Sequence, residues 1–107
     1  MINDPTNLPA LWYEAHDKWC HAHEAAEIAE QAAKVTEAVL FDHAEGASAE
    51  AKKMWVRRQG EYKKKVLEAI QRRTAANLAL GERQKLERSM DVWRTLESTK
   101  RAEMQLK

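Results

Sequence analysis

The feature that most constrains the fold is a regular series of apolar and small residues near the start of the chain. Consecutive members lie alternately four and three positions apart: Leu8, Trp12, Ala15, Trp19, Ala22, Ala26, Ala29, Ala33, Thr36 and Leu40. This spacing is the seven-residue repeat of a helix that packs lengthwise against another helix. Because the series begins with tryptophans and continues in alanines, the partner helix should lie close to the middle of this helix. The series predicts one helix over residues 8–43.

A second helix is predicted after a short turn at residues 44–48. Gly46 is expected to end the first helix in a left-handed conformation, and Ser48 is expected to cap the next one. Apolar residues recur from Met54 to Leu78 and again from Leu86 to Met104, but the two series are out of phase. The second helix should therefore cover residues 49–105, and either it kinks at Gly81 or its last part packs on a different partner.

The predicted fold is an all-α antiparallel helical hairpin, coiled-coil-like, that forms a single domain over residues 1–107. A turn this short makes the flanking helices antiparallel neighbours. The charged fraction of 33% and the alanine-rich apolar set are typical of long helices. In a hairpin closed near Gly46, Trp19 should lie opposite Arg73 or Thr74, and Trp12 opposite Gly81.

Cysteine content and hydropathy indicate a soluble, cytoplasmic protein. Cys20 is the only cysteine, so the chain forms no internal disulfide that would point to an oxidising compartment. No run approaches the ~18 apolar residues of a membrane span, and no basic region followed by an apolar one opens the chain. We therefore expect no contact with a membrane.

The two parts of the chain carry opposite charge. Residues 1–46 hold two basic and nine acidic residues, and residues 47–107 hold sixteen basic and eight acidic ones. Either the two helices attract each other, or the basic part binds a polyanion such as nucleic acid. The nucleic-acid alternative would use one sector of the second helix: Arg57, Lys64, Lys65, Arg72 and Arg83. Trp55 or Tyr62 could stack on bases, but interspersed glutamates favour the first explanation.

Four residues on one face of the first helix suggest a metal site as a further alternative. His16, Cys20, His23 and Glu27 follow one another at intervals of four, three and four, and such ligands can converge on one ion. A structural zinc site needs four ligands, which a single helix rarely supplies, so the sequence favours a half-exposed polar strip. We expect no cofactor, and no enzymatic activity, because a helical hairpin offers little cleft for a catalytic group.

Two apolar surfaces exceed what a hairpin can cover. A second stripe on the first helix, Ile28, Ala32, Val35 and Val39, suggests an additional neighbour. The end of the second helix extends past the first and leaves Trp93, Leu96 and Met104 without cover. We expect a protein partner, a homodimer or both at that end, with Trp93 and Leu96 as anchors and Arg94, Lys100 and Arg101 around them.

The end of the chain resembles a group of phage proteins. The run Val92-Trp93-Arg94-Thr95, followed by Lys100-Arg101-Ala102-Glu103-Met104, is similar to the ending of small helical proteins of temperate phages and prophages, often encoded near recombination genes. The general layout of most of the chain is similar too. The resemblance implies a role in the cytoplasm of a host cell, either in DNA recombination or in blocking a host nuclease or defence system, and it implies no catalytic residue.

Overall fold

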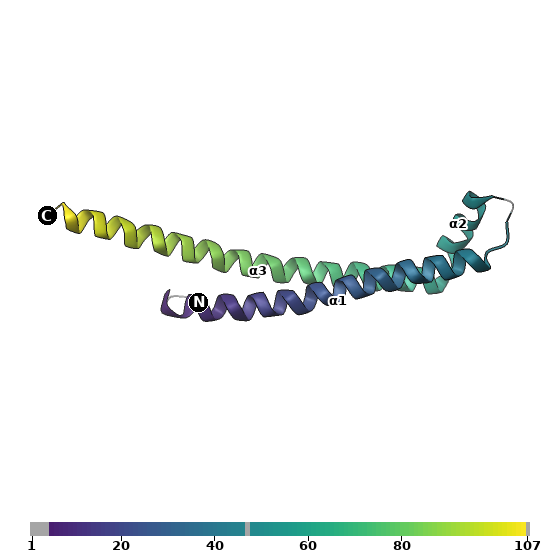
Figure 1. Ribbon diagram of the computed structural model, residues 1–107, viewed down its shortest axis with the longest axis horizontal. Helices are drawn as coiled ribbons and strands as arrows, with labels where there is room; N and C mark the ends of the chain where they lie inside the picture. Colours follow the sequence, from purple (N-terminus) through teal and green to yellow (C-terminus); the bar gives the residue numbers. More distant parts are fainter. Residues whose placement is uncertain (1–4, 47, 107) are drawn as a thin grey trace. The chain divides into compact units, whose positions relative to one another are not determined.

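The regular elements of the described chain are all helices. A computed structural model describes residues 5–46 and 48–106, which form a short 3-10 helix over Pro5–Asn7, then α1 (Leu8–His43), α2 (Ala49–Arg58) and α3 (Gly60–Gln105) (Figure 1). Helices α1 and α3 pack antiparallel, so the predicted all-α helical hairpin is confirmed. Across the described residues, no helix combines the length and the apolar character that a bilayer crossing requires.

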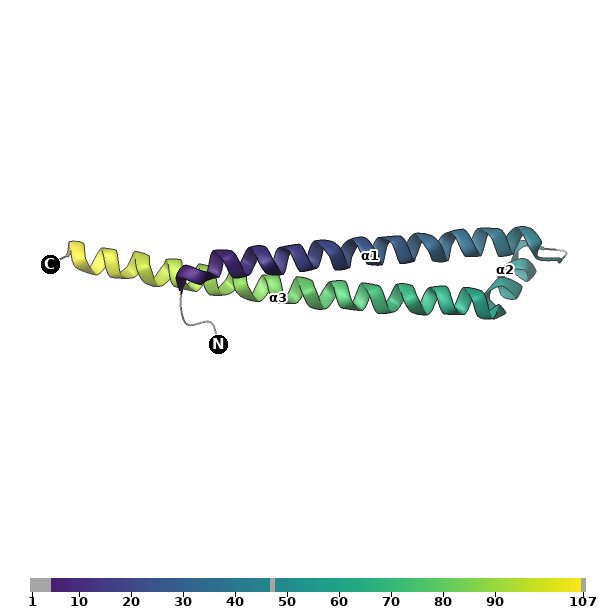
Figure 2. The same cartoon turned by 90° about the horizontal axis from the view of Figure 1, so that it is seen from below.

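The chain packs as two compact units. The terminal unit consists of the described parts of Met1–Cys20 and Asn77–Lys107, and the turn unit consists of the described parts of His21–Ala76. Within each unit a stretch of α1 lies beside a stretch of α3 (Figure 2). The side chains between the helices differ between the units, so each unit is described separately.

Alanines form most of the core of the turn unit. Its buried residues are Ala26, Ala29, Ala33, Ala44, Val56, Ala69 and Ala76. Ala26 is fully buried, with 0% of its surface exposed. Because interaxial distance depends on the side chains at the contact, a seam of methyl groups lets the two helices approach closely. The alanine part of the predicted seam thus faces α3.

The second helical stretch is broken at Gln59, where no break was predicted. Ser48 begins α2 as predicted, since its hydroxyl oxygen accepts from Ala51 N at 3.2 Å. At the other end the backbone N–H of Gln59 donates to Val56 O, and the Gln59 side chain donates to Trp55 O at 2.9 Å. Val56, in the last turn of α2, is buried, with only 1% of its surface exposed.

Of the expectations for two glycines, the one for Gly46 was wrong. Helix α3 is continuous through Gly81, and the break between helices lies at Gln59, so a kink at Gly81 stays a prediction. A helical glycine costs propensity, but its backbone needs no bend unless packing imposes one. Gly46 is not left-handed, since no described glycine has a positive φ. Its role is spatial: a Cβ on Gly46 would lie 3.3 Å from Ala51 Cβ.

The expected register of the hairpin was also wrong. Trp12 pairs with Glu87 instead of lying at Gly81, and Trp19 pairs with Arg83 instead of Arg73 or Thr74. Helix α2 accounts for the difference, because its ten residues do not belong to the long helix that lies along α1. Every partner on α3 is therefore further along the chain than a hairpin of two simple helices would place it.

Candidate interaction surfaces

The end of α3 extends past the residues of α1 that contact it. In the terminal unit, an open groove between the helices is lined by Pro9, Trp12 and Tyr13 of α1, and by Glu87, Met90, Asp91 and Arg94 of α3. From Thr95 to Leu106 no residue is buried, and only Glu97 is half-buried. We call residues 92–106 the terminal segment. It is the part of the described chain with the least cover from α1.

Large apolar side chains are exposed throughout the terminal segment. They are Val92, Trp93, Leu96, Met104 and Leu106. Trp93 exposes 41% of its surface and Met104 exposes 74%. The hydroxyls of Thr95 and Thr99 donate to the carbonyl oxygens of Asp91 and Thr95, so they are satisfied within the helix. What the segment presents to its surroundings is therefore apolar and charged.

The six predicted partner-binding residues divide between two sides of α3. At 100° per residue, Trp93, Leu96, Lys100 and Met104 fall within a sector of about 80°. Arg94 and Arg101 lie together outside that sector, and Arg94 Nη1 forms an ion pair with Asp91 Oδ1 at 3.6 Å. An apolar stripe with one lysine in it is thus flanked on one side by arginines.

A polar and aromatic cluster joins the two helices of the terminal unit. The Trp12 indole N–H donates to Glu87 Oε1 at 3.0 Å, and the His16 ring stacks on Trp12 with ring centroids 4.9 Å apart. The guanidinium of Arg83 lies 4.7 Å from the centroid of the Trp19 ring and donates from Nη1 to His16 Nδ1 at 3.0 Å. The polar groups of Trp12, His16 and Arg83 are thus engaged in contacts within the protein.

Arg83 is the central member of that cluster. Its Nε is buried and lies 3.4 Å from Glu87 Oε1, which makes an ion pair but not a hydrogen bond. The contact with the Trp19 face is a cation–π interaction, for which partly desolvated pairs contribute about 1–2 kcal/mol. Arg83 therefore stabilises the helix pair, and it is not available for the basic stripe proposed from the sequence.

The remaining members of the proposed basic stripe are also separated. Arg57 belongs to α2, whereas Lys64, Lys65 and Arg72 belong to α3, so the break at Gln59 removes the single straight helix on which the stripe was drawn. In the turn unit, Arg73 is directed toward α1, where it binds Glu30 and His23. Five residues of one sector are thus no longer one continuous surface.

The predicted metal ligands do not form one group. Cys20 Sγ lies 3.5 Å from His16 Nε2, but His16 also accepts from Arg83. His23 Nδ1 lies 3.1 Å from Arg73 Nη1, and His23 Nε2 lies 3.0 Å from Glu27 Oε1. Within residues 5–46 and 48–106, no three histidine, cysteine or acidic side chains gather as metal ligands would. Both ring nitrogens of His16 and of His23 thus contact other side chains of the protein.

Arg73 and Glu30 form the principal charged contact of the turn unit. Arg73 Nη2 donates to Glu30 Oε1 at 2.6 Å and Nε donates to Oε2 at 3.1 Å, so the pair is bidentate. The hydrogen bond from Arg73 lowers the pKa of Glu30 below its ordinary value of 4.5. The pair connects an acid of α1 with a base of α3.

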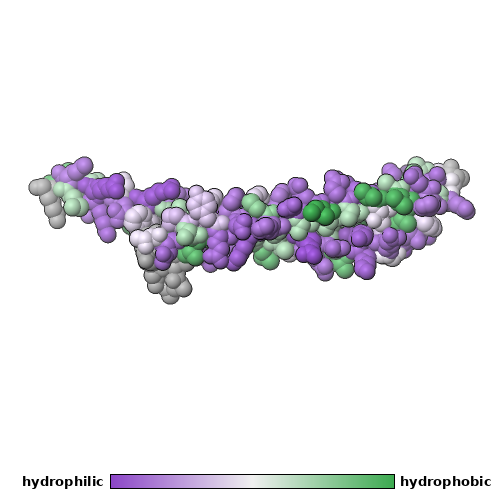
Figure 3. Space-filling view, turned by 60° about the horizontal axis from the view of Figure 1, so that its bottom comes forward, coloured by the Kyte–Doolittle hydropathy of each residue, from purple (hydrophilic) through white to green (hydrophobic). Residues whose placement is uncertain are grey.

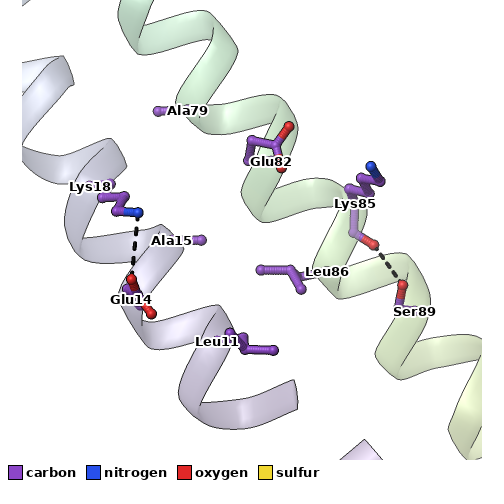
Figure 4. A pocket seen from close by; sticks show the side chains of 9 residues that line it. All are labelled: Leu11, Glu14, Ala15, Lys18, Ala79, Glu82, Lys85, Leu86 and Ser89. Atoms are coloured by element: carbon purple, nitrogen blue, oxygen red, sulfur yellow. Dashed lines mark hydrogen bonds and ion pairs between the residues drawn. The ribbon is translucent and has the colours of Figure 1, made fainter. Parts of the chain in front are cut away.

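A second open groove lies between the helices of the terminal unit. Leu11, Ala15, Ala79 and Leu86 supply apolar walls, and Glu14, Lys18, Glu82, Lys85 and Ser89 complete the lining (Figure 4). The groove has a volume of about 560 Å³. Lys18 is held by Glu14 at 3.5 Å, and the Ser89 hydroxyl donates to Lys85 O. The groove is bordered by charge, and the small residues Ala15 and Ala79 leave it unfilled.

The outer stripe predicted on α1 is exposed in the turn unit. The exposed fraction of the residue is 63% for Ile28, 60% for Val35 and 49% for Val39. Ala32, between Ile28 and Val35, is half-buried. Apolar areas of this kind are visible, in green, among hydrophilic surface in Figure 3. Within the described chain, no helix covers them.

Sequence reasoning missed α2 as a separate element with its own exposed face. Met54 and Trp55 on α2 are exposed, while Val56 beside them is buried. The signal that could have indicated it is the pair Arg57-Arg58 followed by Gly60, since basic residues favour the last turn of a helix. Comparison of the chain with protein-family models, with curated proteins and with solved structures finds no match.

Proposed function

We propose that the chain is a non-enzymatic helical interaction module that binds a protein partner through the terminal segment of α3. The observation that carries this proposal is the row of exposed apolar residues beyond the contact with α1: Trp93, Leu96 and Met104. Exposed tryptophan and leucine at helical spacing are the usual anchors of a helix that docks in a groove or joins a bundle. Leaving them in water on a lone helix is unfavourable.

The charges around the stripe define the kind of partner. Lys100 lies within the stripe, and Arg94 and Arg101 lie at its side. The proposed partner surface is therefore an apolar groove with acidic residues at its rim, because such a rim would pair with these cations. A second copy of the chain fits this description in part, since α1 carries most of the acidic residues of residues 1–46.

The resemblance of the chain's end to phage proteins supplies the biological setting of the proposal. In that setting the partner is a protein of DNA recombination, or a host nuclease or defence protein that the module blocks. Nothing in this role requires a catalytic residue or a cofactor. A module of this kind acts by occupying a surface of its partner.

The test replaces the two anchors together, Trp93→Ala with Leu96→Ala. Sedimentation equilibrium measures self-association, and tagged protein recovered from expressing cells measures capture of other proteins. Truncating a central tryptophan anchor typically costs 2 kcal/mol or more, which is roughly a thirtyfold weaker affinity. We expect both self-association and captured partners to weaken by at least that factor.

The matched control is Leu78→Ala, which removes an exposed leucine from the same helix outside the terminal segment. It should leave capture unchanged. Equal loss in both variants would mean that binding depends on general apolar surface, and survival of every interaction in the double variant would refute the terminal segment as the binding site. Circular dichroism establishes that each variant keeps its helical content.

A further inference from the structure

Positive charge is concentrated on α2 and the first turns of α3. Residues 49–65 contain seven basic residues and two acidic ones, Glu50 and Glu61. We call the seven the basic patch: Lys52, Lys53, Arg57, Arg58, Lys63, Lys64 and Lys65. All but Lys52 and Lys65 are exposed, and those two are half-exposed. No other stretch of comparable length in the chain is so basic.

Acidic side chains of the described chain leave this charge unpaired. Elsewhere, Lys18, Arg73, Arg83 and Arg94 each form an ion pair. Within the described residues no member of the basic patch does so, and Lys52 instead lies 5.5 Å from the centroid of the Phe41 ring. Glu37 lines the same small cavity as Lys53 and Arg57, so it offsets part of the field there. The other members face solvent.

An exposed aromatic residue lies among these cations. Trp55 exposes 37% of its surface, although it neighbours the buried Val56 that anchors α2 to the turn unit. On a helix, Met54 and Arg58 project away from the side occupied by Val56, and Trp55 projects between the two sides. The outward side of α2 thus combines an indole face with guanidinium groups.

This combination is suited to single-stranded nucleic acid. Lysine and arginine in an open arrangement neutralise successive phosphates, and an exposed indole stacks on an unpaired base whatever its identity. A lipid surface is less well suited, because an amphipathic helix binds a bilayer through an outward apolar face. Helix α2 exposes only two large apolar side chains, Met54 and Trp55, because Val56 is buried, so its outward apolar face is small.

We propose that the basic patch binds single-stranded nucleic acid, with the lysines and arginines on the phosphates and Trp55 stacked on a base. This site is separate from the terminal segment, and it includes Arg57, Lys64 and Lys65 but neither Arg72 nor Arg83 of the stripe predicted from the sequence. It adds a second binding activity to the proposed module. The protein would then hold a nucleic acid and a protein partner at different parts of the chain.

Fluorescence anisotropy with a labelled oligothymidine, and with a duplex of the same length, tests the proposal on the full chain. The patch variant is Arg58→Gln with Lys63→Gln and Lys64→Gln. For single strands the slope of log affinity against log salt is about 0.7 per phosphate contact, so the slope should decrease by about 2. Affinity for the oligothymidine should weaken tenfold or more, in keeping with roughly that slope change.

The control variant, Arg72→Gln with Lys85→Gln and Arg88→Gln, removes the same net charge from exposed positions outside the patch. It should weaken affinity for the oligothymidine by less than roughly threefold, because charges outside the patch contribute only through the long-range electrostatic field of the protein. The variant Trp55→Ala should weaken oligothymidine binding by roughly tenfold and leave duplex binding unchanged, because only unpaired bases stack. Circular dichroism checks that all three variants fold.

Three results of the anisotropy measurements would overturn the proposal. They are an unchanged anisotropy at low salt, equal weakening by the patch and control variants, and duplex affinity equal to or above that of the single strand. Binding to anionic lipid vesicles in place of oligothymidine would overturn it too. The variant Trp93→Ala with Leu96→Ala should leave oligothymidine affinity unchanged, and the patch variant should leave protein capture unchanged, so this proposal and the proposed function fail independently.

Discussion

The turn unit and the terminal unit pack the same two helices with different side chains. In the turn unit, α1 and α3 meet through alanines, and a bidentate pair of Arg73 and Glu30 lies at the edge. In the terminal unit, the buried residues are Leu8 and Leu86, and large polar and aromatic side chains join the helices. Alanines along the seam let the helices of the turn unit approach closely, whereas a mixture of small and large side chains in the terminal unit leaves open grooves between the helices.

This comparison explains where binding surfaces occur. A seam of alanines covers only a narrow strip of each helix surface. Other apolar residues of the turn unit, such as Ile28 and Val35, therefore stay exposed. In the terminal unit, bulky residues of α1 cover more of the α3 surface. However, α1 begins at Leu8, and the last turns of α3 extend past the residues of α1 that line a groove with it. Uncovered apolar surface arises from narrow packing in one unit and from unequal helix length in the other.

The largest expected effect on stability is a difference between two variants that carry the same substitution, alanine to leucine, one in each unit. Ala26→Leu introduces a side chain where α1 and α3 are in contact and no surface is exposed. Overpacking of this kind costs about 1–3 kcal/mol. Urea denaturation followed by circular dichroism should show a lower free energy of unfolding for the variant.

Ala79→Leu is the matching change in the terminal unit. Ala79 is half-buried and lines the groove beside Leu86, where space for a leucine side chain exists (Figure 4). Partial burial of the added methylene groups should raise the free energy of unfolding by up to about 1 kcal/mol. Equal destabilisation by the two variants would contradict the contrast between a filled seam and an open groove.

A smaller effect is expected from the glycines of α3. Gly81 lies in the helix interior within the terminal unit, and a Cβ there would meet no atom within 4 Å. Gly81→Ala should stabilise the protein by about 0.5–1 kcal/mol, because alanine loses less backbone entropy than glycine in a helix. Thermal melting monitored by circular dichroism measures the change.

Gly60→Ala is the control in the turn unit. Gly60 is the first residue of α3 and also has open space at its Cβ position. Helix propensity matters less at a terminus, so the gain should be smaller than at Gly81. If Gly81→Ala destabilised the protein instead, α3 would bend at that position after all, as one alternative from the sequence had it.

Local signals explain which parts of the fold the sequence could predict. The seam of alanines and the cap at Ser48 depend on neighbouring residues, and the observed α1 and the start of α2 agree with them. The break at Gln59 depends on burial of Val56 and on a side-chain bond to Trp55 O, and both exist only in the folded chain. The pair Arg57-Arg58 followed by Gly60 is a local signal at this position, but such a pair also occurs in helix interiors and does not by itself predict a break.

Errors in the candidate sites followed from that missing break. The register of α3 against α1 depends on how many residues α2 occupies, so the partners of Trp12 and Trp19 could not be derived correctly. Arg83 was assigned to a solvent-facing stripe, but the true register brings it against Trp19 and His16. The terminal segment depended only on unequal helix length, and its role as the binding site stays a prediction.

The smallest expected effect concerns the pair of Glu30 and Arg73, because both side chains are partly exposed and water screens their charges. The pKa of Glu30 is lowered in the folded protein by the hydrogen bond from Arg73. A lowered pKa means that the pair stabilises the fold above the unfolded pKa, close to 4.5, and that this contribution is lost as the pH falls through the folded value.

Glu30→Gln should therefore lower the melting temperature at neutral pH, and the difference from the unmodified protein should narrow as the pH falls below 4.5. The matched control is Glu14→Gln in the terminal unit, which removes an exposed carboxylate whose partner Lys18 lies one turn away on the same helix. That variant should show a smaller difference at neutral pH, since an ion pair within one exposed helix contributes little. A Glu30→Gln difference that stayed constant from neutral to acidic pH would show that the pair is not the charged contact joining α1 to α3 in the turn unit.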